Sequence, residues 1–315
     1  MKTFHIKFYE NRKIYFGITL AVFVIGIIFN IIFGTQLDIQ FRGGTMLEYT
    51  YTDEIATADV EAAVEQATGQ NVEVRVYENM GSGEDVNGLS ITFAGTDSIT
   101  VEQQEEIASL IREQYPDSSL TIEETSSVDR TMGSSFFAKC LVAVGITFVL
   151  LVIYIAFRFK KIGGASAGVI SIIALLHDVV IVYFTFVIFQ MPINDNFIAV
   201  VLTILGYSLN NTIIIYDRIR ENRKALGPKA PTSQLVNLSI NQTLTRSIFT
   251  SLCTFAAIAC VCVVGFIYNL TSVTTFALPM MVGVLVGCYS SVCITGPLYV
   301  MWRNYKDNKK ARAKQ

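Results

Sequence analysis

Six long apolar stretches, separated by polar segments, dominate the chain. A helix needs about 20 mostly apolar residues to cross the hydrocarbon core of a bilayer. All six are long enough, and their only charged side chains are Lys139, near the start of the second, and Asp178, in the middle of the third. The pattern therefore predicts six transmembrane helices, at residues 14–33, 136–157, 164–189, 197–216, 247–268 and 275–302.

The segment between the first two stretches, residues 34–135, has a different pattern. Runs that alternate apolar and polar residues predict strands, and apolar residues three or four apart predict helices. In chain order these elements are a strand (46–51), a helix (57–68), two strands (71–77 and 89–93), a helix (100–114) and a strand (120–124). The order βαββαβ is that of a ferredoxin-like domain. The predicted fold class is thus an α-helical polytopic membrane protein with an α+β ferredoxin-like domain after its first helix.

The distribution of charge predicts how the chain is oriented. Lys and Arg concentrate on the cytoplasmic side of membrane proteins. Here 19 of the 24 lie in four segments, residues 1–13, 158–163, 217–246 and 303–315, which six spans place on one side. We therefore expect a cytoplasmic N-terminus, a cytoplasmic loop at 217–246 and a cytoplasmic basic tail at 303–315. Residues 34–135 are then extracytoplasmic.

Composition narrows the classes of function. Only 16% of the residues are charged and 52% are hydrophobic, whereas soluble proteins average about 25% charged residues. Residues 38–135 hold 20 of the 26 acidic residues and four basic ones, so the charge is strongly split along the chain. These features argue against a basic nucleic-acid binder and a disulfide scaffold. The six cysteines all lie in apolar stretches, so we expect neither disulfides nor a metal site.

Asp178 is the first candidate for chemistry. A carboxyl at the centre of a span costs about 2.5–3.5 kcal/mol on insertion scales. It is interpreted as a titrating or ion-binding group facing the bundle interior, and the alternative is a neutral carboxyl that only joins helices. Its neighbour His177 points about 100° away around a helix, so we expect a packing role for His177.

The fourth stretch carries a polar cluster in an otherwise apolar helix. It runs from Tyr207 through Ser208, Asn210 and Asn211 to Thr212. Such a cluster either lines a wet path or forms hydrogen bonds between helices, and the residues alone leave both open. Arg246, at the predicted start of the fifth span, is by itself typical of an anchor that extends to the membrane surface.

Several short motifs resemble those of one family. Phe41-Arg42-Gly43-Gly44-Thr45 resembles the FRGGT signature of the SecD/SecF family. Residues 205–222 (LGYSLNNTIIIYDRIREN) resemble the fourth-span signature of the smaller of that family's two subunits. Residues 176–178 and 243–247 match its third-span and fifth-span motifs. The resemblance covers essentially the whole chain, with one departure, because the family usually has Asp where this chain has Asn211.

The resemblance implies a subunit of the bacterial Sec preprotein translocase in the plasma (inner) membrane. It implies a SecD-like partner, so that six spans form half of an RND-like unit beside the SecYEG channel. The pair would pull unfolded preproteins on the outer side in late, gradient-dependent steps of export. A proton or ion gradient would drive it, with no cofactor, and no P-loop string occurs. It would be a transport subunit, not an enzyme.

The same resemblance, together with the polar residues within the spans, points to residues for coupling and for a hinge. The candidates for proton or ion coupling are Asp178, Arg246, Asn211, Asn210 and Ser208. The glycines of the FRGGT motif permit backbone angles closed to other residues, so residues 41–45 are expected to form a hinge. Two alternative functions stay open: an RND-type exporter of lipids or small molecules, and an assembly factor of the translocon that does not itself transport.

Overall fold

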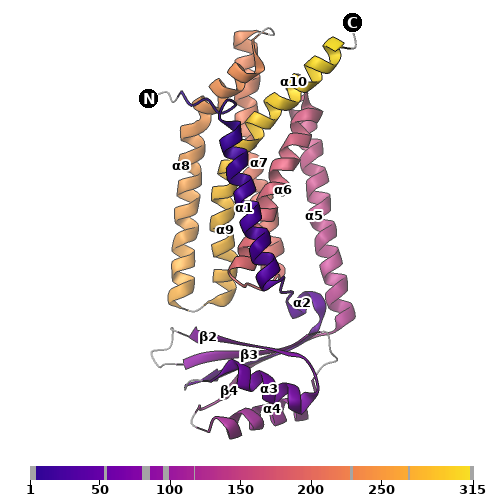
Figure 1. Cartoon of the computed structure of the whole chain (residues 1–315), viewed down its shortest axis with the longest axis vertical. Helices are drawn as coiled ribbons and strands as arrows, with labels where there is room; N and C mark the ends of the chain where they lie inside the picture. The colour runs from indigo at the N-terminus through magenta and orange to yellow at the C-terminus, as the bar shows by residue number, and fades with distance from the viewer. Residues whose placement is uncertain are drawn as a thin grey trace.

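A bundle of long helices stands on a small domain that contains a sheet (Figure 1). The computed structural model describes residues 5–52, 55–79, 86–94, 99–116, 118–227, 230–268 and 270–312. Both ends of the chain lie at the end of the bundle opposite the sheet (Figure 1). The parts of the predicted cytoplasmic ends at residues 1–4 and 313–315 lie outside the described residues.

Six described helices are long and apolar enough to cross a membrane, as the sequence predicts. The sixth span runs without a break through a π-helical turn, labelled η2. A short 3-10 turn, labelled η1, links the second span to the third. The elements are α1 (Arg12–Phe33), α5 (Arg130–Arg158), η1 (Lys160–Ile162), α6 (Gly164–Ile188), α7 (Asp195–Leu226), α8 (Thr232–Ile267), α9 (Thr271–Tyr289), η2 (Ser290–Thr295) and α10 (Gly296–Arg312).

Two segments predicted outside the spans are helical. The predicted cytoplasmic loop at 217–246 is mostly the end of α7 and the start of α8, which are joined by a short connection after Leu226. The predicted tail from residue 303 continues α10 to Arg312. Hydropathy locates where a helix leaves the apolar layer, but intrahelical hydrogen bonding continues through charged residues with good helix propensity.

The spans divide into a central and a peripheral set. In the most apolar 18-residue stretch of each helix, 61% of the residues of α6 and 56% of those of α7 are buried within the chain. In α1 and α5 the buried share of the same stretch is only 6%. The sixth span is as buried as α7, and α8 is mostly exposed. The central helices carry the small and polar residues that allow close packing, whereas the peripheral ones present apolar side chains outward, as lipid requires.

The segment between α1 and α5 folds in the predicted βαββαβ order. It contains β1 (Gly44–Tyr51), α3 (Thr57–Thr68), β2 (Val72–Asn79), β3 (Val86–Ala94), α4 (Val101–Gln114) and β4 (Thr121–Val128). The antiparallel sheet has the order β2-β3-β1-β4. Its apolar face packs on α3 and α4, which lie on the side away from the bundle (Figure 1). The alternation of buried and less buried residues along β1 is what period-2 patterning produces.

The N-terminal segment is fastened across the bundle to α8. Asn241 pairs with the backbone of Ile6 in both directions, at 3.0 and 2.8 Å. Asn237 accepts from the Tyr9 backbone at 3.0 Å and donates to Glu10 at 2.8 Å. We call residues 6–10 the N-terminal strap. Phe8, within it, is buried in the core of the bundle.

Candidate functional site: a buried carboxyl shared by three spans

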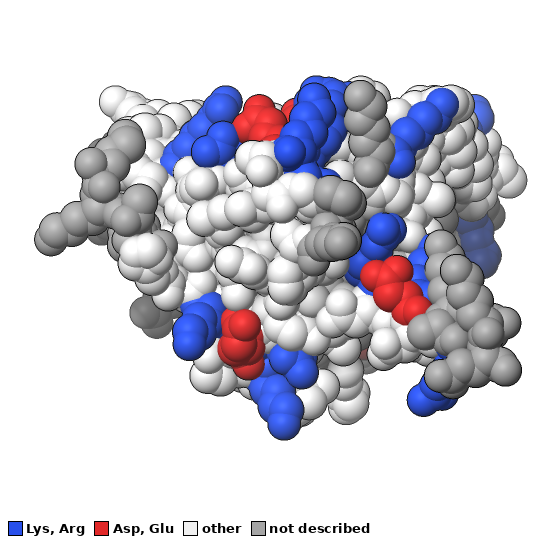
Figure 2. Space-filling view, turned by 90° about the horizontal axis from the view of Figure 1, so that it is seen from above, with Lys and Arg blue, Asp and Glu red and all other residues white. Residues whose placement is uncertain are grey.

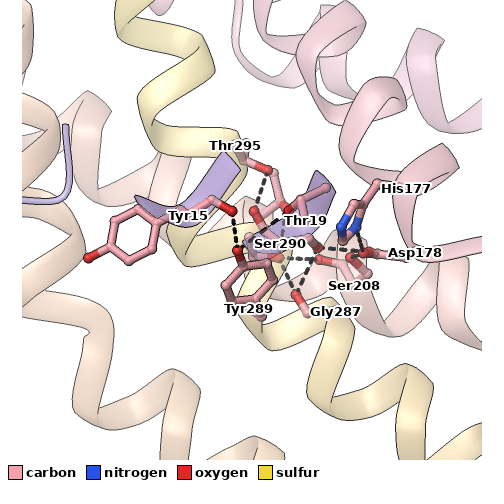
Figure 3. Close-up of polar contacts among 11 residues, drawn as sticks. Tyr15, Thr19, His177, Asp178, Ser208, Gly287, Tyr289, Ser290 and Thr295 are labelled. Carbon is pink, nitrogen blue, oxygen red and sulfur yellow. Dashed lines mark hydrogen bonds and ion pairs between the residues drawn. The ribbon is translucent and has the colours of Figure 1, made fainter. Parts of the chain in front are cut away.

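Asp178 lies fully buried where α6, α7 and the sixth span meet (Figure 3). Its Oδ2 accepts hydrogen bonds from Ser208 Oγ of α7 at 2.5 Å and from Ser290 Oγ of η2 at 2.8 Å. Its Oδ1 is 2.9 Å from Nδ1 of His177. Both oxygens are thus hydrogen-bonded, as a polar group in an apolar interior requires. The carboxyl connects three helices that are far apart in sequence.

The backbone of the sixth span widens beside this carboxyl. Ser290–Thr295 form a π-helix, and Thr295 Oγ1 donates to the Ser290 carbonyl at 3.2 Å. Ser291 Oγ contacts the carbonyls of Ser208, at 3.1 Å, and of Gly287, at 2.8 Å. A π-turn adds one residue to the helical turn and is frequent at functional sites. Here it lets two consecutive serines reach α6 and α7 together.

Glycines bring the sixth span close to α7. A Cβ added at Gly283 would lie 1.9 Å from Cδ1 of Ile204, and one added at Gly287 would lie 3.0 Å from Cβ of Ser208. A larger residue at Gly283 would displace the Ile204 side chain, and one at Gly287 would press against Cβ of Ser208 and push the two helices apart. The close approach is therefore a condition for Ser208 and Ser290 to share one carboxylate oxygen.

His177 belongs to the site, contrary to the expected packing role. Although the residues are adjacent, the His177 ring turns toward Asp178 and is stacked on Phe23 of α1 with centroids 5.5 Å apart. When Nδ1 carries the proton and donates to Asp178, Nε2 keeps the lone pair. Nε2 is buried and has no hydrogen-bond partner among the described residues. The angle of about 100° between adjacent residues does not prevent this contact, because the side-chain torsions of His177 turn its ring along the helix toward Asp178.

A second aromatic group extends the polar network to α1. The Tyr289 hydroxyl donates to the Tyr15 carbonyl at 2.8 Å and lies 3.4 Å from Thr19 Oγ1. Its ring is 6.3 Å from that of His177 (Figure 3). The peripheral span α1 therefore contacts the same network as the central spans.

The other coupling candidates are not all in this cluster. Asn211 is buried one turn beyond Ser208, and its Nδ2 has no partner among the described residues. Asn210 is exposed on the opposite side of α7. Arg246 is exposed on α8 and has no hydrogen bond or ion pair within the described part of the chain. The structure thus brings Asp178 and Ser208 together and leaves Asn210 and Arg246 on the outside.

The FRGGT glycines form a tight joint between the sheet domain and α5. Gly43 has φ +76°, and a Cβ there would lie 2.4 Å from Cα of Arg130. Gly44 has φ +139°, and Gly133 is close enough that its own Cβ would lie 2.9 Å from N of Gly43. Only glycine combines these angles with this approach. The expected hinge stays a prediction, and the described conformation is closely packed.

The remaining FRGGT residues anchor the joint on both sides. Phe41, in the short helix α2 (Ile39–Arg42), is buried against Phe137, with centroids 4.9 Å apart. Arg42 forms an ion pair with Glu73 of β2 at 3.3 Å. Thr45 Oγ1 is 3.2 Å from Ser127 Oγ of β4. The motif therefore joins the bundle to the sheet domain.

Sequence reasoning missed the contribution of the sixth span. Ser290, Ser291 and Tyr289 complete the site, and Thr212 Oγ1 contacts Ser291 Oγ at 3.0 Å. The available signal was the run Cys288-Tyr289-Ser290-Ser291, which interrupts an apolar stretch as the fourth-span cluster does. No group of three or more His, Cys, Asp and Glu side chains is placed to hold a metal ion in the described ranges.

Comparisons with known proteins agree with this architecture. The family described as "Protein export membrane protein SecD/SecF, C-terminal" matches residues 108–305. SecF of Endomicrobium trichonymphae is 31% identical over 98% of this chain and 94% of its own length. SecDF of Bacillus subtilis is 33% identical over 94% of this chain, which spans 38% of that protein.

A solved structure shares the fold. The crystal structure of SecDF from Thermus thermophilus, described as a translocon-associated membrane protein, matches with a TM-score of 0.78 and 29% identity. The match covers 95% of this chain and 39% of that one. Together with the family match over residues 108–305, this similarity shows that the chain belongs to the SecD/SecF family of protein export membrane proteins.

Proposed function

We propose that this chain is an accessory subunit of the Sec translocase that uses a proton or ion gradient, without a cofactor, to promote late steps of preprotein export. It is a transport subunit, not an enzyme. The single observation that carries the proposal is the buried carboxyl of Asp178, held by hydroxyls from two other spans. The similarity to SecF and SecDF proteins over nearly the whole chain supports the assignment to export.

Protonation of Asp178 changes the contacts among three spans. An ionised carboxylate only accepts hydrogen bonds, so Ser208, Ser290 and His177 all donate to it. A protonated carboxyl also donates, so at least one of the three partners must stop donating and accept instead, by rotation of a serine hydroxyl or by a shift of the His177 proton from Nδ1 to Nε2. Because these donors lie on α6, α7 and η2, each protonation event favours a different packing of the central helices. This is how a gradient can do mechanical work at this site.

A SecD-like partner covers the exposed polar positions. Asn210 is exposed two residues from Ser208, within a span, and Gly206 and Thr203 continue the same exposed stripe of α7. Polar side chains within a membrane face protein or water rather than lipid tails. Small residues beside them allow a second helix to approach. The stripe therefore supports a partner helix against α7, and Arg246 is exposed on α8, which packs against α7.

The chain resides in the bacterial plasma membrane, with both termini cytoplasmic and the sheet domain outside. The two connections on the sheet side, at residues 190–196 and 269–274, contain no Lys or Arg. On the outer side, the acidic sheet domain is available to unfolded preproteins that leave the SecYEG channel. Movement of the central helices reaches this domain through α5 and the FRGGT joint.

The test is export by inverted membrane vesicles from cells that produce the Asp178→Asn variant with its partner. We expect normal insertion and loss of the gradient-dependent part of export, because an amide cannot change its protonation state. Asp195→Asn is the matched control, since Asp195 is exposed at the outer start of α7. Full gradient-dependent export by Asp178→Asn would refute the proposed coupling site.

A further inference from the structure

A basic cleft lies at the end of the bundle that carries both termini. It has a volume of about 730 Å³ and lies between α10 and the start of α6. Its lining includes Lys160, Gly163, Ser166, Arg303, Lys306 and Lys309. Seen from this end, Lys and Arg prevail over acidic residues (Figure 2). None of the residues that line the cleft is acidic.

The basic groups of the cleft have few competing partners. Lys306 Nζ donates to Ser166 Oγ at 2.8 Å, a neutral partner that leaves its charge uncompensated. Arg303 reaches Asp307 only at 3.8 Å, and a Cβ at Gly163 would lie 3.1 Å from its Nη1. Arg303 and Lys306 therefore face the start of α6 with most of their hydrogen-bonding capacity free for an anion.

The N-terminus of α6 opens into the same cleft. Gly163 precedes the helix in a left-handed conformation, and Gly164 and Ser166 are in its first turn. The first backbone N–H groups of a helix carry a partial positive charge. Here Ser166 and Ala167 donate to the Gly163 carbonyl, at 2.8 and 3.1 Å, which leaves the N–H groups of Gly164 and Ala165 for a ligand. These groups and the basic side chains converge from two elements, which is the arrangement that binds phosphate groups.

Aromatic side chains place the cleft at the membrane surface. Trp302 is 38% and Tyr305 is 62% exposed, one turn or less from Lys306 on α10. On the other wall, the Lys160 ammonium lies over the ring of Phe157, 4.6 Å from its centroid. Trp and Tyr favour the headgroup layer of a bilayer. A ligand that enters the cleft at the depth of the headgroups is one that is itself anchored in the bilayer.

We propose that this cleft binds the phosphodiester headgroup of an anionic phospholipid. The phosphate is held by Lys306, Arg303 and the start of α6, and the acyl chains lie along the exposed apolar surface of α5. Basic clefts between helices on the cytoplasmic side suit such headgroups, because the charge adds to the attraction of the anionic leaflet. Binding there links the third span, which carries Asp178, to the sixth span, whose Ser290 donates to Asp178.

The test uses the full chain in nanodiscs of phosphatidylcholine with increasing phosphatidylglycerol, with bound lipids counted by native mass spectrometry. The triple variant Lys160→Gln, Arg303→Gln, Lys306→Gln is expected to lower the apparent affinity for phosphatidylglycerol by at least about tenfold. The matched control is Lys7→Gln, Lys13→Gln, Lys224→Gln, which removes the same charge at exposed positions outside the cleft. The control should bind within about twofold of the unaltered chain.

Two outcomes would overturn the proposal. Equal phosphatidylglycerol binding by the triple variant and the control would show that binding follows net charge and not the cleft. Displacement of phosphatidylglycerol by equimolar inorganic phosphate would assign the cleft to a free anion. The single variant Lys306→Gln leaves Arg303 in place, so it tests the cleft even if the triple variant misfolds. It should weaken phosphatidylglycerol binding several-fold.

Discussion

Asn211 is a buried polar residue whose surroundings do not satisfy its side chain. It is buried, and its amide Nδ2 has no acceptor within the described residues. An unpaired buried donor costs about 1–3 kcal/mol, and a neutral carboxyl of nearly the same shape has one donor hydrogen where the amide has two. We therefore expect Asn211→Asp to keep its thermal stability near neutral pH. The new carboxyl lies one turn from Ser208, so export should depend more steeply on pH.

The comparison for this prediction is export measured at several pH values in unaltered, Asn211→Asp and Asn211→Ala membranes. Asn211→Ala removes the amide without adding a titrating group, and its pH profile should match that of the unaltered chain. An Asn211→Asp profile that overlies the other two would show that this position does not take part in proton transfer.

Tyr49 gives a prediction for the sheet domain. Burial raises the pKa of Tyr49 to about 12, and its hydroxyl has no partner among the described residues. The folded state therefore holds the proton more tightly than the unfolded state. This contribution is fully present below about pH 10 and is lost as the pH rises toward 12. The domain should lose about 2–3 kcal/mol of unfolding free energy over that window.

The check is an alkaline titration of tyrosinate absorbance for the full chain and for Tyr49→Phe. The difference curve should contain one group that ionises near pH 12. Tyr49→Phe should also be more resistant to unfolding above pH 10. A difference curve centred at an ordinary tyrosine value would mean that this hydroxyl reaches water.

At this scale, the sequence singles out Asp178 and Ser208, which the structure brings together, but not the residues that they contact. Asp178 stands out because a carboxyl is costly in a span, and Ser208 because it belongs to a polar cluster. The partners could not be chosen the same way, since Ser290 is 112 residues away and serines are unremarkable in a membrane helix. His177 was misjudged because side-chain rotamers, and not only helical angles, decide which neighbours meet.

At the scale of elements, the FRGGT joint allows a controlled test. Gly43 and Gly69 both have positive φ, +76° and +65°, but only Gly43 would bring a Cβ against another helix. Gly69→Ala should cost about 1 kcal/mol for its backbone angle alone. Gly43→Ala should cost about 1–3 kcal/mol more, because Arg130 and the start of α5 must move.

Thermal unfolding of the purified full chain and limited proteolysis of the sheet domain measure both costs. Gly43→Ala should lower the midpoint further than Gly69→Ala and expose the residues that connect the domain to α5. Equal effects of the two substitutions would mean that the joint is loose enough to admit a methyl group, which a hinge would allow.

The elements themselves were largely predictable. Apolar length locates the six spans, and period-2 patterning locates the strands, because each signal reflects burial of that segment. The helical extensions of α7, α8 and α10 were missed because charged residues end an apolar stretch without ending a helix. The π-helix of the sixth span could not be predicted, since a π-turn is a rare widening of a single helical turn and has no hydrophobic period of its own.

At the scale of the whole molecule, the orientation can be tested directly. In a chain without its native cysteines, Ser109→Cys lies on an exposed face of the sheet domain and Gln234→Cys near the start of α8. An impermeant thiol reagent should label only the first in intact spheroplasts and both after permeabilisation. Labelling of Gln234→Cys alone in intact spheroplasts would reverse the proposed topology.

The arrangement of spans around α6 and α7 could not be read from the sequence. Hydropathy treats the six stretches alike, whereas the structure buries three and leaves α1, α5 and α8 at the periphery. What separates the sets is the placement of small and polar residues, such as Gly283 and Ser208, whose significance depends on the helix opposite. The exposed stripe of Thr203, Gly206 and Asn210 on α7 is likewise visible only once the bundle is assembled.

The N-terminal strap has a consequence for the order of assembly during synthesis. Its hydrogen bonds join residues 6–10 to Asn237 and Asn241, so they cannot form until the start of α8 has left the ribosome. Until then, α1 lies in the bilayer without the hydrogen bonds that join the strap before it to α8. Its lack of charge between Ile14 and Phe33, and its small buried share, suit a helix that is stable alone in lipid. Closure of the strap is therefore a late event in biogenesis, and a stalled chain that ends before residue 237 should still carry a mobile N-terminus.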